Sequence, residues 1–85
     1  MTDLEFDILD ELYFVQSFTY IQSQVGTEEA TLKAGLAILL EKGWIRCFKS
    51  HQDEVVTEDE LDFSTHYQDY YYLATKEGLL AHNTR

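Results

Sequence analysis

Residues 21–45, IQSQVGTEEATLKAGLAILLEKGWI, contain two helical segments separated by a short turn. The second segment carries its leucines at Leu32, Leu36, Leu39 and Leu40. This spacing gives a helix one apolar stripe. Gly26 and Gly43 follow the two segments, where a left-handed residue commonly ends a helix, and Thr27 is predicted to cap the second helix. Two helices joined by a short turn containing glycine form a helix-turn-helix pattern, here over residues 17–43.

The order of residues in this pattern resembles the winged helix-turn-helix regulators of the MarR and PadR type. The matching positions in the helices and the turn are Ile21, Val25, Gly26, Leu32, Leu36 and Leu39. Lys42, Gly43 and Ile45 then match the basic, glycine and apolar positions that lead into the family's wing. Further on, YYYL at 70–73 and TKEG at 75–78 look like the second wing strand and the Thr-x-x-Gly helix start of the family.

The resemblance implies one α+β, mostly α, winged-helix domain over residues 1–85. It places a three-helix core first, with the helix-turn-helix at 17–43. A two-stranded wing follows at 44–73 with an acidic loop at 51–66, and a short C-terminal helix covers 76–82. Winged helices bind DNA in transcription regulators, but the fold also serves as a protein-binding module, so the resemblance implies no single function.

Local signals outside residues 21–45 agree with this arrangement. Thr2 and Glu5 have the spacing of a capping box, and an apolar stripe continues the first helix to about residue 15. Ser17 or Thr19 is predicted to cap the next helix, and Thr75 the last one. Residues 44–49 and 67–73 are predicted strands, and residues 55–57 could add a short one.

The net charge of −10 is unevenly distributed along the chain. Residues 1–16 carry five acids and no bases, whereas residues 17–50 carry four bases against three acids. The loop at 51–66 holds six acids within ten residues: Asp53, Glu54, Glu58, Asp59, Glu60 and Asp62. A DNA-binding surface is usually basic, because it displaces counterions from the phosphates. The charge therefore favours a protein partner or self-association over nucleic acid.

The outward face of the second helix of the motif is predicted to consist of Ala30, Ala34, Ala37, Ile38 and Glu41. Recognition of base edges needs Arg, Lys, Asn or Gln, which this face lacks. We therefore predict a non-catalytic protein-interaction or regulatory domain. Its candidate contacts are Ala34, Ile38, Trp44, Arg46, Tyr70 and Tyr72, since displayed tyrosine is common at interfaces.

The alternative is a DNA-binding transcriptional regulator of the winged-helix type. Its candidate DNA contacts are Lys33, Lys42, Arg46 and Lys49. Four bases can contact only a few phosphates, so such binding would be weak and sensitive to salt. A third hypothesis is an acidic mimic that occupies the groove of a DNA-binding protein.

No residue pattern indicates catalysis, a metal or a cofactor. Cys47 and the histidines His51, His66 and His82 lack metal-ligand spacing, and Cys47 is expected to be a buried small hydrophobe. The acidic N-terminus has no apolar core, so no signal peptide is expected, and no run is long enough to span a membrane. A single cysteine is compatible with a reducing compartment, and a cytoplasmic location is predicted.

Overall fold

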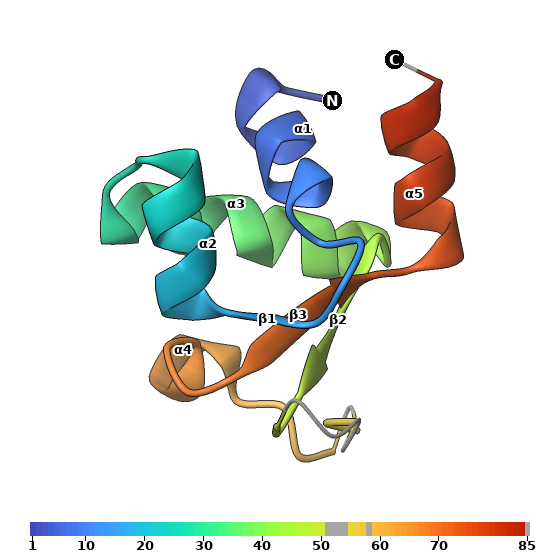
Figure 1. The fold of residues 1–85 in the computed structure, drawn as a ribbon. Helices are drawn as coiled ribbons and strands as arrows, with labels where there is room; N and C mark the ends of the chain where they lie inside the picture. The colour runs from blue at the N-terminus through green and yellow to red at the C-terminus, as the bar shows by residue number, and fades with distance from the viewer. Residues whose placement is uncertain (51–54, 58, 85) are drawn as a thin grey trace.

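The computed structural model describes residues 1–50, 55–57 and 59–84 (Figure 1). This part of the chain forms five helices and a three-stranded antiparallel sheet, in agreement with the predicted α+β class. The helices are α1 (Asp3–Asp10), α2 (Phe18–Val25), α3 (Glu29–Lys42), α4 (Phe63–His66) and α5 (Lys76–Asn83). The strands are β1 (Gln16–Ser17), β2 (Ile45–Phe48) and β3 (Tyr71–Ala74).

α1 begins as predicted but ends earlier. Thr2 and Glu5 form the capping box, with the hydroxyl of Thr2 accepting the N–H of Glu5 at 3.2 Å. The helix ends at Asp10 rather than near residue 15. Leu12 is nevertheless fully buried, and its carbonyl accepts the N–H of Ala74 at 3.0 Å. The apolar stripe therefore continues into a loop that β3 holds through a backbone hydrogen bond.

The turn between α2 and α3 follows the prediction at Gly26 but not at Thr27. Gly26 and Gly43 both adopt left-handed backbone angles, with φ of 71° and 74°, as expected at these helix ends. The N-cap of α3 is Glu28, which makes no side-chain capping bond. The turn is thus one residue longer than predicted, and the carbonyl of Thr27 accepts a hydrogen bond from Gln22 at 3.4 Å.

The sheet has the order β1-β3-β2, so β3 lies in the centre. β2 pairs with β3 from Ile45↔Ala74 to Phe48↔Tyr71. β1 pairs with the other edge of β3, with Gln16 opposite Tyr72. The predicted pair of strands is present as β2 and β3, but the prediction missed the third strand, β1. Two polar or small residues form β1, and they carry no alternating pattern that a sequence could reveal.

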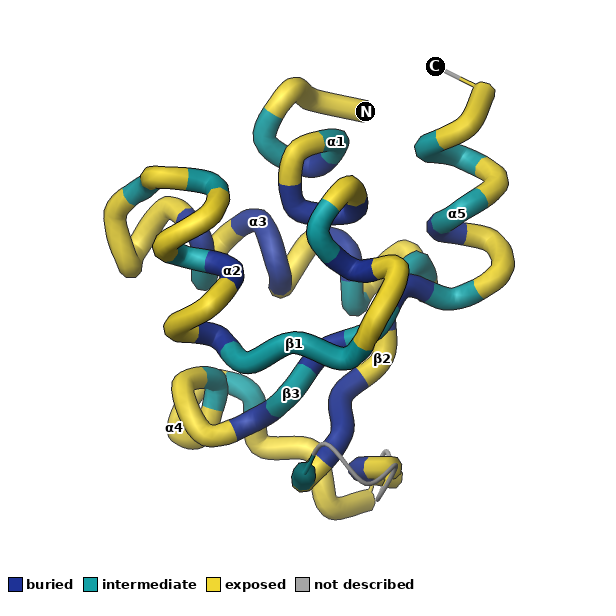
Figure 2. Tube along the Cα trace, in the orientation of Figure 1, coloured by how far each residue is buried: buried dark blue, intermediate teal, exposed yellow. Residues whose placement is uncertain are grey.

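The core lies between the helices and the sheet, where Figure 2 shows buried stretches of α1, α3, β2 and β3 facing one another. The predicted stripe of α3 forms its centre, since Leu32, Leu36 and Leu39 are fully buried. Tyr72 is the largest fully buried side chain, and its hydroxyl donates to the carbonyl of Tyr67 at 2.6 Å. A buried tyrosine needs such a partner for its hydroxyl.

The acidic segment differs from the single loop predicted for residues 51–66. Residues 51–54 and 58 lie outside the described residues, as do the acids Asp53, Glu54 and Glu58. Residues 63–66 form α4 instead of loop, and β3 starts at Tyr71 rather than at residue 67. Residues 55–57 form no separate strand, but Val55 makes an isolated bridge with Phe48.

Candidate interaction surfaces around α3 and β2

The outward face of α3 is exposed as predicted. Ala30, Ala34, Ala37, Ile38 and Glu41 are all exposed. Ile38 is the largest of them and is 44% exposed. The inward leucines anchor the helix to the core, so this orientation follows from the apolar stripe. The face offers a surface of small apolar side chains with one acid.

Lys42 is engaged by a buried carboxylate from α1. Its Nζ lies 2.6 Å from Oε1 of Glu5, which is only 2% exposed. Burial raises the pKa of Glu5, but hydrogen bonds from Lys42 and Thr2 outweigh it and lower the pKa to about 2. The Nζ of Lys42 also lies 4.5 Å from the ring centroid of Trp44, within the range of a cation–π contact.

The other two candidate lysines also have partners within the molecule. The Nζ of Lys33 lies 4.5 Å from the ring centroid of Tyr67 and donates to the carbonyl of Ser64 at 3.4 Å. The hydroxyl of Tyr67 donates in turn to the carboxylate of Glu29, which raises the pKa of Tyr67. Lys49 forms an ion pair with Glu60. Three of the four candidate DNA contacts therefore already contact another group of the chain. Lys33 contacts an aromatic ring and a carbonyl, whereas Lys42 and Lys49 each contact a carboxylate.

Arg46 is the fourth candidate, and it lies on β2 with its side chain exposed. It forms no ion pair with any other residue in the described ranges. Trp44, next to it, is half-buried beneath Lys42. Of the six predicted interaction residues, the structure thus leaves Ala34, Ile38 and Arg46 exposed and Trp44 partly accessible.

Tyr70 and Tyr72 are not displayed, which corrects the prediction. Tyr70 is 9% exposed, and its hydroxyl accepts the N–H of Asp62 at 3.0 Å. Tyr72 is fully buried, and the ring of Phe63 lies edge-on at 6.5 Å between centroids. α4, absent from the prediction, brings Phe63 against this face of the central strand. Burial also raises the pKa of Tyr72 well above its usual range.

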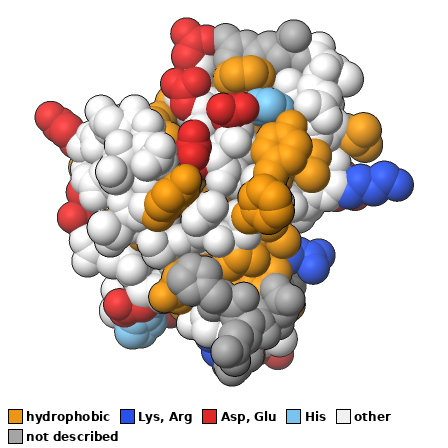
Figure 3. Space-filling view, in the orientation of Figure 1, with side chains coloured by type: hydrophobic (Ala, Val, Ile, Leu, Met, Phe, Trp, Pro, Cys, Tyr) orange, Lys and Arg blue, Asp and Glu red, His pale blue; other side chains and the backbone are white. Residues whose placement is uncertain are grey.

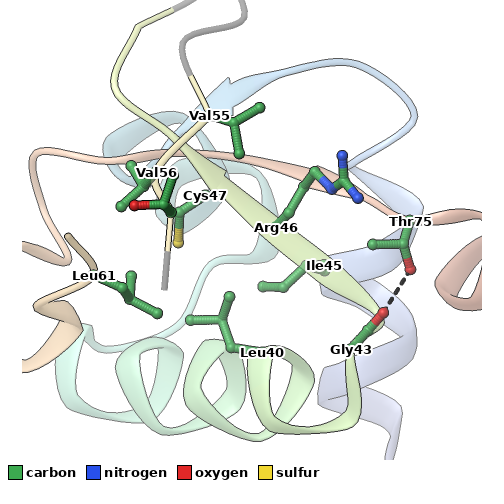
Figure 4. A pocket seen from close by; sticks show the side chains of 10 residues that line it. Leu40, Gly43, Ile45, Arg46, Cys47, Val55, Val56, Leu61 and Thr75 are labelled. Atoms are coloured by element: carbon green, nitrogen blue, oxygen red, sulfur yellow. Dashed lines mark hydrogen bonds between the residues drawn. The ribbon is translucent and has the colours of Figure 1, made fainter. Parts of the chain in front are cut away.

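An open groove lies along the edge of β2, with a volume of about 440 Å³ (Figure 4). It is lined by Leu40, Gly43, Ile45, Arg46, Cys47, Val55, Val56, Thr57, Leu61 and Thr75. Cys47 is 3% exposed, as predicted for a small hydrophobe, and burial raises the pKa of its thiol to about 12. The raised pKa favours the protonated thiol at neutral pH.

A second exposed apolar region was not predicted. Phe14 is 75% exposed in the loop before β1, Tyr13 is 45% exposed, and Leu80 on α5 is 55% exposed. The hydroxyl of Tyr13 lies 3.1 Å from Nδ1 of His82, whose ring stacks on Phe6. In Figure 3, hydrophobic side chains lie beside a histidine on the face that is turned toward the viewer. The apolar pattern predicts that the first helix continues to about residue 15. The pattern therefore gives no sign that Phe14 lies exposed in a loop.

Within the described ranges, no three His, Cys, Asp or Glu side chains come together in a way that could hold a metal ion. No helix in these ranges is long and apolar enough to cross a membrane. Comparisons of the chain with protein-family models, with curated proteins and with solved structures found no match.

Proposed function

We propose that this chain is a winged-helix domain that acts as a non-catalytic protein-interaction or regulatory module. Its proposed docking surface is the exposed face of α3. The winged-helix assignment is supported by two features of the fold. α2 and α3 are joined by a short turn with a left-handed Gly26, and the antiparallel pair of β2 and β3 follows α3.

The apolar outer face of α3 carries the proposal. A helix that reads bases in the major groove presents Arg, Lys, Asn or Gln to their donors and acceptors. The central positions of this face are Ala34, Ala37 and Ile38. Small apolar groups let another protein approach closely, and an exposed isoleucine supplies area that an interface would bury.

The charge distribution supports the same proposal. Lys33, Lys42 and Lys49 each contact a group of the same chain, so few cations remain for phosphates. The net charge of −10 opposes approach to DNA, most strongly at low salt. An acidic surface can instead speed association with a basic protein partner.

The test is to replace Ile38 by Asp and measure association. We expect Ile38→Asp to abolish self-association in sedimentation velocity, or capture of a partner that the wild-type chain retains on a column. A charge buried in an apolar interface is costly, while this exposed residue contributes little to folding. Leu80→Asp is the matched control, because Leu80 is also a large apolar residue, is 55% exposed and lies on α5.

Circular dichroism establishes that both variants are folded. If Ile38→Asp associates as the wild type does, the α3 face is not the docking surface. If the wild-type chain neither self-associates nor retains a protein, the module assignment itself fails.

The alternative function is a DNA-binding regulator, and exposed Arg46 is the observation that favours it. A fluorescence titration with mixed-sequence duplex DNA at low salt distinguishes the two functions. We expect no binding. Binding that weakens steeply with salt and is lost in Lys33→Glu or Arg46→Glu would replace the protein-interaction proposal.

The proposed location is the cytoplasm. Cys47 is the only cysteine of the sequence, so it cannot form a disulfide within the chain. Its thiol is buried in the fold. A reducing compartment keeps a cysteine as the free thiol, which supports the proposed location.

A further inference from the structure

Two consecutive aromatic residues are exposed in the loop between α1 and β1. Phe14 is 75% exposed, and Tyr13 is 45% exposed. Burying such rings releases water from a large apolar area, and exposed aromatic side chains are common at protein interfaces. The pair is therefore a candidate contact surface for another molecule.

The loop is held on both sides of the two rings. Before them, Leu12 is fully buried and its carbonyl accepts the N–H of Ala74 at 3.0 Å. After them, Gln16 pairs with Tyr72 in the central strand. A surface that is already ordered loses less conformational entropy when a partner binds.

Contacts with α5 fix Tyr13 and place it beside a carboxylate. The hydroxyl of Tyr13 donates to Oδ1 of Asn83 at 3.1 Å and lies 3.1 Å from Nδ1 of His82. The other ring nitrogen of His82, Nε2, lies 3.2 Å from Oδ1 of Asp10. Tyr13 and Asp10 therefore contact the same imidazole ring. The side chain of Asp10 remains 57% exposed, so this carboxylate is still accessible to a partner.

The surface next to the two rings is acidic. Asp7 and Asp10 are exposed and lie three residues apart on α1, so they share one side of the helix. Neither pairs with a lysine or arginine among the described residues. In Figure 3, acidic and hydrophobic side chains lie close together around a histidine. A negative surface of this kind attracts a positively charged partner.

We propose that Tyr13, Phe14 and the exposed carboxylates of α1 bind an arginine-bearing segment of a basic partner protein. This inference rests on the proposed protein-binding function and adds a second surface to it, separate from the exposed face of α3. An arginine satisfies both features of the surface. Its planar guanidinium stacks on an aromatic ring, and its positive charge is attracted by the carboxylates of Asp7 and Asp10.

Other occupants fit this surface less well. A second copy of the chain would bring two acidic surfaces together, and like charges oppose association. The phosphates of a nucleic acid are repelled for the same reason. A purely apolar segment would cover the rings but would leave the carboxylates of Asp7 and Asp10 without a counter-charge.

The test uses two peptides labelled with tetramethylrhodamine, Gly-Ser-Arg-Gly-Arg-Ser-Gly and the same peptide with lysine in place of both arginines. Fluorescence anisotropy at low salt measures their binding to the full chain. The two peptides carry the same charge, so a difference in affinity reports stacking on the rings. We expect the arginine peptide to bind about threefold more tightly, because the lysine ammonium is more strongly hydrated and stacks less well.

Phe14→Ala should remove this difference between the peptides, because Phe14 is the more exposed of the two rings. Tyr20→Ala is the matched control, since Tyr20 is an aromatic residue that is 40% exposed but lies on α2. It should leave the difference unchanged. Circular dichroism establishes that both variants are folded.

Asp7→Asn should weaken both peptides equally, by about twofold, because it removes charge and leaves the rings in place. Glu41→Gln is the matched control, since it removes an exposed acid from α3 and lowers the net charge of the chain by the same amount. It should have a smaller effect. Ile38→Asp should bind the arginine peptide at least as tightly as the wild type does, so failure of this surface and failure of the α3 face are measured separately.

Four results would overturn the proposal. Absence of binding by both peptides would remove the site, and equal affinity for the two would remove the stacking. An equal loss in Asp7→Asn and Glu41→Gln would mean that the peptides respond only to the net charge. Self-association that is lost in Phe14→Ala and competes with the peptide would assign the surface to a second copy of the chain.

Discussion

A Cβ atom on Gly78 would lie 2.0 Å from the carbonyl oxygen of Trp44, so the start of α5 rests directly on the backbone that leads into β2. The same carbonyl accepts the N–H of Thr75 at 2.9 Å. The hydroxyl of Thr75 donates to the carbonyl of Gly43 at 2.7 Å and accepts the N–H of Gly78 at 3.1 Å. The Thr-x-x-Gly helix start therefore joins α5 to the end of α3.

Gly78→Ala should destabilise the fold by about 3 kcal/mol, because the new methyl group meets a backbone oxygen that cannot move without breaking its hydrogen bond. Gly35→Ala is the matched control. There the Cβ would lie 2.9 Å from Cδ1 of Ile8 and 3.1 Å from Cδ2 of Leu4, which are side-chain ends and not backbone, and alanine improves helix propensity, so we expect a smaller loss. Thermal melts of both variants check this. A Gly78→Ala melt at the wild-type temperature would contradict the close contact with Trp44.

Glu5 should make stability depend on pH in the acid range. Its pKa falls from 4.5 to about 2 on folding, so its carboxylate stabilises the fold above pH 4.5 and loses this effect as the pH falls through 2. The shift corresponds to about 3 kcal/mol. Urea denaturation at a series of pH values should show this loss in the wild type and a smaller one in Glu5→Gln. If the free energy of unfolding depends on pH in the same way in both proteins, the ion pair between Glu5 and Lys42 makes no net contribution to stability.

Cys47 should resist alkylation in the folded chain. Its thiol has a pKa of about 12 and is 3% exposed, so thiolate is scarce and the reagent has little access. Iodoacetamide labelling followed by mass spectrometry should be slow in buffer and complete in denaturant. Rapid labelling without denaturant would show that β2 opens in the native state.

Tyr72→Phe should cost about 1–2 kcal/mol, because the carbonyl of Tyr67 loses the hydroxyl that donates to it. Tyr20→Phe removes a hydroxyl from a side chain that is 40% exposed and should be nearly neutral. Urea denaturation of the two variants measures the difference. If the two variants are equally stable, the hydrogen bond of the Tyr72 hydroxyl contributes nothing to the stability of the fold.

The sequence by itself determined those features that depend on near neighbours. The capping box at Thr2, the cap at Ser17, and the left-handed Gly26 and Gly43 arise from hydrogen bonds and backbone angles within a few residues. The apolar stripe of α3 set which side of that helix is buried. These features are local, so the pattern of residues is enough to predict them.

Only the tertiary structure decided the features that depend on distant partners. α1 ends at Asp10 because β3 binds the carbonyl of Leu12, and β1 exists because β3 has an edge to pair with it. Tyr72 is buried because distant elements pack around the central strand, and α4 adds Phe63 edge-on to its ring. Lys42 meets Glu5 across 37 residues of sequence. Contacts between such remote positions leave no periodic signal, because they follow from how the elements pack.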